Sequence, residues 1–167
     1  MRVVVMRHAK AEPSAPSDFE RPLADRGRRD AAEAGAWLAA RGWIPDHALV
    51  SAAQRTRDTW ESLAAGGDFD LDPDFDRSVY SADPEAVLDL ARLVPDTART
   101  LIIIGHNPTM GSMAQLLHDG TGDQAAITEM SGDFPTSALA LFEYDGAWPD
   151  LSWTTCRLEG FHVGRGD

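Results

Sequence analysis

Three short apolar runs, each ending next to a positively charged or imidazole side chain, constrain the fold of this chain most strongly. They occupy residues 3–6, 48–50 and 101–104, and the first and third are rich in valine and isoleucine. Runs of this kind are typical of strands buried on both faces of a parallel sheet. A helix-like segment follows each run. The alternation predicts a single three-layer α/β/α domain over residues 1–167, with a mainly parallel central sheet.

The side chains at the ends of these runs indicate a function. The first run leads directly into Arg7 and His8, and the third leads through Gly105 into His106. Arg55 falls in the first turn of the helix expected after the second run. Ligands of open α/β sheets bind beyond the carboxyl ends of the strands. We therefore expect these four side chains to converge on one phosphate site that needs no metal ion.

Four motifs, taken in chain order, resemble the histidine phosphatase superfamily. They are Arg7-His8-Ala9, Arg21-Pro22-Leu23, the spaced set Ser51, Arg55 and Thr59, and Gly105-His106-Asn107-Pro108. The second of these motifs is similar to that of the small SixA-type branch, the phosphohistidine phosphatases. The resemblance covers residues 3–141. It departs from the family at Ala9, where glycine is more usual, and an alanine there asks for an ordinary backbone conformation.

The resemblance implies a phosphoglycerate mutase-like fold and a role for each site residue. His8 would be the nucleophile that carries the phosphoryl group. Arg7, Arg21 and Arg55 would bind the phosphoryl oxygens, and His106 would contact them as a protonated partner. No cofactor is implied. The sequence shows no metal-ligand spacing, and neighbouring arginines would repel a cation, so we also expect no metal.

A general acid is the missing part of this site. Larger members of the superfamily use a carboxyl group to protonate a leaving alkoxide. Glu12, Asp76 and Asp83 are positional candidates here, and Asp83 is also expected to cap a helix. His47, His118 and His162 have no arginine beside them and are expected to be structural.

Charge is distributed unevenly along the chain. The formal net charge is −12, yet residues 1–57 hold ten Lys and Arg against seven Asp and Glu. Residues 58–167 hold five against twenty. The acidic balance argues against nucleic acid or an anionic membrane surface as a partner. The positive part contains the arginines of the expected phosphate site.

Cys156 is the only cysteine, so an intrachain disulfide is ruled out and a reducing compartment is expected. The sequence shows neither a signal peptide nor an apolar run of the roughly 20 residues that a membrane span needs. These observations predict a cytoplasmic location. They do not predict an oligomeric state.

Local signals place the remaining elements. We expect a helix capped by Asp25 that reaches about residue 41, and a helix capped by Asn107 that has Pro108 as its first residue. Residues 118–132 are expected to form a loop. Residues 138–144 and 151–157 are expected to form an antiparallel pair of strands at the sheet edge.

Several functions are compatible with this pattern. The first is removal of a phosphoryl group from phosphohistidine on a protein. The second is hydrolysis of small phosphomonoesters. A mutase is disfavoured because the chain has no long insertion to shield an intermediate from water. A non-catalytic phosphate-binding module is disfavoured by His8, since arginines alone would serve binding.

Overall fold

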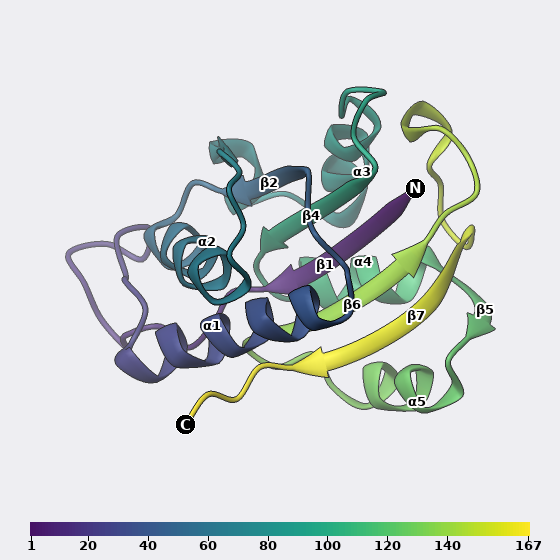
Figure 1. Cartoon of the computed structure of the whole chain (residues 1–167). Helices are drawn as coiled ribbons and strands as arrows, with labels where there is room; N and C mark the ends of the chain where they lie inside the picture. The colour runs from purple at the N-terminus through teal and green to yellow at the C-terminus, as the bar shows by residue number, and fades with distance from the viewer.

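The structure is a computed structural model that describes all of residues 1–167. Seven strands form one sheet in the order β3-β2-β4-β1-β6-β7-β5 (Figure 1). Their bounds are β1 Arg2–Arg7, β2 His47–Ser51, β3 Asp74–Asp76, β4 Thr100–Gly105, β5 His118–Gly122, β6 Ala138–Glu143 and β7 Cys156–Val163. Four of the six strand pairs are parallel, and only β6 runs antiparallel to its neighbours β1 and β7. The expected mainly parallel sheet is confirmed.

Helices cover both faces of this sheet (Figure 1). They are α1 Asp25–Ala40, α2 Gln54–Gly67, α3 Pro84–Arg92, α4 Thr109–Leu117 and α5 Gln124–Gly132, with short 3₁₀ helices η1 Arg77–Tyr80 and η2 Trp148–Asp150. Alternate side chains of a strand point to opposite faces. Val4 and Met6 of β1 therefore pack with α1 and α2, whereas Val3 and Val5 pack with α3, α4 and α5. All four are fully buried, and the three-layer architecture is confirmed.

Two glycines let α1 and α2 lie unusually close. A Cβ atom on Gly35 of α1 would meet the carbonyl oxygen of Leu63, and one on Gly66 of α2 would meet that of Ala32, each at 1.9 Å. Only a residue without Cβ fits at these positions. The start of α2 lies against the loop 11–24, where the Gln54 amide donates to the Phe19 carbonyl at 2.9 Å.

The prediction of a loop over residues 118–132 was wrong, because that segment forms β5 and α5. β5 is a largely exposed edge strand and so carries no apolar alternation. The carboxylate of Asp123 caps α5 by accepting from the Ala126 amide at 2.9 Å. The second strand of the expected antiparallel pair begins at Cys156 rather than residue 151, and β5 separates it from the sheet edge.

Two predicted helix caps were also wrong. Asp25 is the first residue of α1, and Ala24 occupies the N-cap without a side-chain bond. Pro108 is the N-cap of α4, while the side chain of Asn107 accepts from the Gly111 amide at 3.2 Å. The cap by Asp83 on α3 is confirmed, because its carboxylate accepts from the Ala86 amide at 2.9 Å. None of the helices has the length and apolar character required to cross a membrane.

Candidate active site

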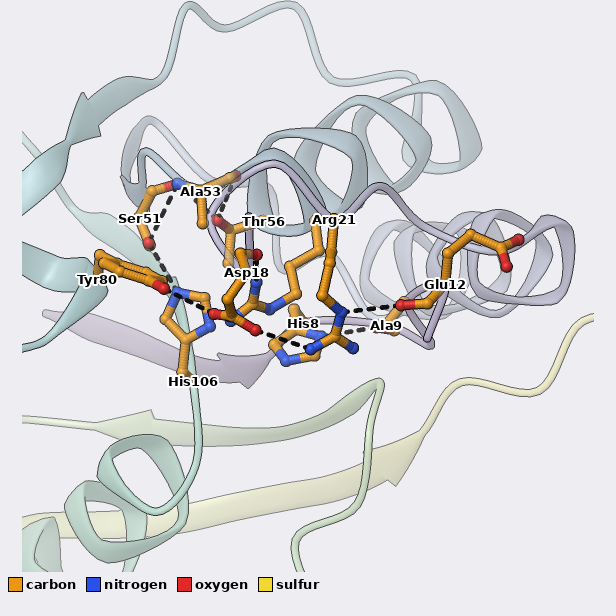
Figure 2. Close-up of polar contacts among 11 residues, drawn as sticks. His8, Ala9, Glu12, Asp18, Arg21, Ser51, Ala53, Thr56, Tyr80 and His106 are labelled. Carbon is orange, nitrogen blue, oxygen red and sulfur yellow. Dashed lines mark hydrogen bonds and ion pairs between the residues drawn. The ribbon is translucent and has the colours of Figure 1, made fainter. Parts of the chain in front are cut away.

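Neighbouring strands bring the predicted residues to one edge of the sheet. Arg7 ends β1 and is paired with Gly105 at the end of β4, so His8 and His106 follow adjacent strands. The His8 amide donates to the Gly105 carbonyl at 3.0 Å, which holds the two chain segments together. Arg55 enters from the first turn of α2. The side chains of His8, His106 and Arg21 lie together at this edge (Figure 2), and the charges of Arg55 and Arg7 act on His8.

His8 is held in one protonation state and one orientation. Its Nδ1 lies 2.7 Å from the carbonyl oxygen of Ala9. A carbonyl only accepts, so Nδ1 carries the proton and Nε2 keeps the lone pair. The side chain is 9% exposed, and burial, together with the charges of Arg55, Arg7 and Arg21, lowers the pKa of His8 from 6.5 to about 4. The imidazole is therefore neutral at physiological pH, with its Nε2 able to act as a nucleophile.

Thr59 connects the backbone after His8 to α2. Its hydroxyl accepts from the Ala9 amide at 3.1 Å and donates to the Arg55 carbonyl at 2.6 Å. The threonine of the spaced motif thereby fixes the backbone that follows His8. Ala9 itself is fully buried and is not among the residues of positive φ, so its methyl group is accommodated in an ordinary conformation.

His106 lies next to His8, with the ring centroids 5.3 Å apart. Its Nε2 is 2.8 Å from the Ser51 hydroxyl oxygen, and the edge of Tyr80 packs against its ring. Burial lowers the pKa of His106 to about 3, with further contributions from His8 and the cation of Arg55. The protonated His106 implied by the resemblance is therefore not the state of the unliganded site.

The three arginines have different partners. Arg55 is 6% exposed and donates from Nη1 to the backbone carbonyl of Asp18 at 2.7 Å and from Nη2 to its carboxylate at 3.1 Å. Arg21 donates to the Glu12 carbonyl at 2.8 Å and to the Asp18 carboxylate at 2.9 Å. Arg7 donates to the Phe134 carbonyl at 3.2 Å.

Four buried side-chain polar atoms in this chain have no hydrogen-bond partner. They are Nε of Arg7, Nε of Arg55, Nδ1 of His106 and Oγ of Ser137. Such atoms are rare in folded proteins, because leaving a buried donor unpaired costs about 1–3 kcal/mol. Three of the four belong to predicted site residues. The Ser137 amide in turn donates to the His8 carbonyl at 3.1 Å, so the fourth residue adjoins the site.

Asp18 and Tyr80 were missed by the sequence reasoning. The carboxylate of Asp18 accepts from the Tyr80 hydroxyl at 2.6 Å as well as from Arg21 and Arg55 (Figure 2). These bonds, that from Tyr80 first, hold the pKa of Asp18 far below its usual value. The only available signal was Asp18's position three residues before the Arg21-Pro22-Leu23 motif.

None of the three carboxylates considered as general acids is hydrogen-bonded to a side chain of this cluster. Glu12 is exposed, and its side chain points away from the histidines (Figure 2). Asp76 binds the amide and hydroxyl of Ser78, and Asp83 caps α3. Asp18 is the carboxylate within the cluster, and it is ionised at neutral pH. Nowhere in the structure do three His, Cys, Asp or Glu side chains form a group suited to a metal ion.

A mainly parallel sheet with two histidines and three arginines gathered at its carboxyl edge defines an α/β protein with a cluster of cationic side chains beyond its strand ends. Residues 3–77 match the sequence profile of the histidine phosphatase superfamily, branch 1. The chain is 40% identical over 162 residues to the uncharacterized protein Rv1276c of Mycobacterium tuberculosis, covering 96% of this chain and 100% of that one. This chain belongs to the histidine phosphatase superfamily.

Solved structures agree with this family assignment. A proposed phosphohistidine phosphatase SixA from Nakamurella multipartitia is 29% identical, with a TM-score of 0.85 over 98% of this chain and 95% of that one. A second proposed phosphohistidine phosphatase SixA, from Agrobacterium tumefaciens, is also 29% identical, with a TM-score of 0.77 over 97% of each chain. These likenesses support a phosphatase of the SixA type, as the sequence motifs indicated.

Proposed function

We propose that this chain removes phosphoryl groups from phosphohistidine on proteins, through a phospho-His8 intermediate and without a metal ion. The observation that carries the proposal is the set of unpaired buried donors on Arg7, Arg55 and His106 beside the free Nε2 of His8. A tetrahedral oxyanion bound there would satisfy the donors. It would also place phosphorus within reach of the nucleophile.

The first step follows from the state of His8. Nε2 attacks phosphorus, and the bond from phosphorus to the substrate imidazole breaks on the opposite side. The leaving imidazole retains a proton on its other nitrogen and departs neutral. Charge on the three equatorial oxygens is stabilised by Arg7 and Arg55, with Arg21 at the entrance. No proton has to come from the enzyme.

The second step uses the hydrogen bond to Ala9. After transfer, the His8 ring carries phosphorus on Nε2 and still holds its proton on Nδ1, donated to the carbonyl at 2.7 Å. The ring is then cationic and leaves readily as neutral imidazole. Water attacks phosphorus, and its two protons remain with the product as dihydrogen phosphate. His8 thereby returns to its starting state.

The shape of the site favours a substrate carried on a protein surface. The two hollows of the molecule, of about 470 and 300 Å³, lie elsewhere, one beside the start of β1 and the other between β3 and α3. Neither hollow is lined by His8, and the Asp18 side chain in the site is 54% exposed. A histidine projecting from another protein can approach such a site, whereas a small metabolite would gain little enclosure.

The leaving group distinguishes this proposal from hydrolysis of small phosphomonoesters. Alkoxide departure needs a proton donor, which contributes about 10²- to 10⁴-fold. An imidazole with an ordinary pKa of about 6.5 needs none. We expect kcat/KM to fall in the order phosphohistidine peptide, aryl phosphate, alkyl phosphate. Fast turnover of alkyl phosphate, with a large loss of activity on changing Glu12, Asp76 or Asp83, would instead support the hypothesis that the chain hydrolyses small phosphomonoesters.

The nucleophile is tested with His8→Ala. The matched control is His47→Ala, because His47 begins β2 and lies at the end of that strand away from the site. His8→Ala is expected to abolish hydrolysis of 4-nitrophenyl phosphate and phosphohistidine peptide, whereas the control retains activity. Acid-quenched wild type incubated with substrate should carry acid-labile phosphate on His8. Undiminished turnover by a folded His8→Ala protein would refute the mechanism, and it would leave the fold assignment unaffected.

A further inference from the structure

Ser51 contacts the second histidine of the site. It is the last residue of β2 and is fully buried. Its hydroxyl oxygen lies 2.8 Å from Nε2 of His106 and 3.4 Å from the backbone nitrogen of Ala53 (Figure 2). These are the only two hydrogen-bond partners of that oxygen. Its surroundings therefore determine where its single proton goes.

Counting donors and acceptors assigns that proton. The Ala53 amide donates, so the Ser51 oxygen accepts there with a lone pair. The buried hydroxyl has one proton to give, and Nε2 of His106 is the only acceptor within reach; a proton on Nε2 would leave the serine O–H without a partner. Nε2 then accepts and carries no proton of its own. A neutral imidazole with a bare Nε2 is protonated on Nδ1.

The opposite nitrogen faces the nucleophile's surroundings. Nδ1 of His106 is buried and has no partner in the protein. With a proton, Nδ1 is a donor for a phosphoryl oxygen. In the reverse tautomer a lone pair would meet that oxygen, and the two would repel each other.

We infer that Ser51 is a positioning residue that fixes His106 as the neutral Nδ1–H tautomer, so that His106 donates to a phosphoryl oxygen without carrying a charge. That the group bound beside His106 is a phosphoryl group rests on the proposed function. The surrounding groups favour the neutral ring. His8, Arg55 and Arg7 all oppose an additional positive charge, and Asp18 alone favours it.

The wild-type protein tests the tautomer directly. We would record ¹⁵N–¹H long-range correlation spectra of ¹⁵N-labelled protein near neutral pH, with and without inorganic phosphate. The expected His106 signals are a protonated Nδ1 and an unprotonated, hydrogen-bonded Nε2 in both samples. A protonated Nε2, or two protonated nitrogens in either sample, would overturn the inference. This measurement does not depend on turnover, so it stands even if the proposed reaction fails.

Variants test the role of Ser51. Ser51→Ala should let both His106 tautomers coexist and lower kcat by roughly 5- to 10-fold, the range expected for one ordinary hydrogen bond. Ser51→Thr keeps the hydroxyl and should restore both the tautomer and the rate. A Ser51→Ala protein with the wild-type tautomer would overturn the inference. If neither variant folds, the wild-type spectrum still decides.

A replacement of His106 separates a neutral donor from a cation. The amide nitrogen of asparagine can occupy the place of Nδ1 and donate without charge, whereas alanine offers no donor. The inference predicts that His106→Asn retains at least 10-fold more activity than His106→Ala, since one oxyanion donor is worth about 10²- to 10³-fold in kcat. Equal losses in the two variants would count against a neutral donor.

Discussion

The neutral state of His8 has a measurable cost in acid. Folded His8 has a pKa of about 4, whereas an imidazole in the unfolded chain titrates near its ordinary 6.5. Between these two values the unfolded chain binds a proton that the folded protein does not, so stability falls as the pH is lowered. The separation is 2.5 pH units, and at about 1.36 kcal/mol per unit the wild type loses about 3 kcal/mol by pH 4.

Replacing the imidazole removes this loss. The His8→Gln side chain binds no proton in this range. The free energy of unfolding of this variant, relative to that of the wild type, should therefore rise by about 2–3 kcal/mol as the pH is lowered from about 7.5 to about 4.5. Urea denaturation in phosphate-free buffer at intervals across that range measures the difference. His47→Gln, at the far end of β2, is the matched control for removing one imidazole. Parallel curves for wild type and His8→Gln would show that the buried ring is not held neutral.

Three further outcomes follow from the site. Asp18→Asn frees the arginine donors that the Asp18 carboxylate occupies, so competitive inhibition by inorganic phosphate should strengthen by roughly 3- to 10-fold. Glu12→Gln, a charge change in the same loop, is the control and should leave this inhibition unaltered. Weaker inhibition of the Asp18→Asn protein would mean that the carboxylate orients the arginines instead. Thr59→Val leaves the Ala9 amide without its acceptor and should lower the free energy of unfolding in urea by about 1–3 kcal/mol. Turnover should survive prolonged chelation with EDTA, and a loss restored by a divalent ion would contradict the metal-free mechanism.

The central part of the site could be predicted because it depends on short-range sequence order. A buried parallel strand needs a continuous apolar run, and the residue at its carboxyl end projects at the edge where ligands bind. Arg7 with His8 comes directly after one such run, His106 follows another by one glycine, and Arg55 lies in the first turn of the helix after a third. Their convergence therefore follows from the sheet alone.

The partners of these residues could not be found in the same way. Asp18 lies in a loop whose path is set by bonds to distant elements, such as the Phe19 carbonyl accepting from Gln54. Tyr80 arrives from η1, beyond the edge strand β3, and meets Asp18 across 62 residues of sequence. No spacing in the chain encodes such a contact. Nor does any motif reveal the depressed pKa values of the two histidines, since both depend first on burial.

The segment 118–132 shows a different limit of prediction from sequence. β5 is His118 to Gly122, and most of it is exposed at the sheet edge. An edge strand of this kind has no buried face to impose alternation, so its sequence is indistinguishable from that of a loop. Asp123 did provide a cap signal for α5, with Ala126 and Met130 four residues apart on the buried side. The helix was therefore predictable, and only the strand was not.

The arrangement separates charge from proton donation. Arginine stays charged at any physiological pH, so the guanidinium groups can supply the positive potential for an oxyanion throughout the reaction. Burial first, and those same charges in addition, keep His8 neutral, which the proposed nucleophile requires. A second imidazolium 5.3 Å away would strengthen anion binding, and it would also reduce the electron density that His8 offers to phosphorus. A neutral His106 that donates from Nδ1 avoids this conflict, because it stabilises the transferring oxygens without opposing the attack.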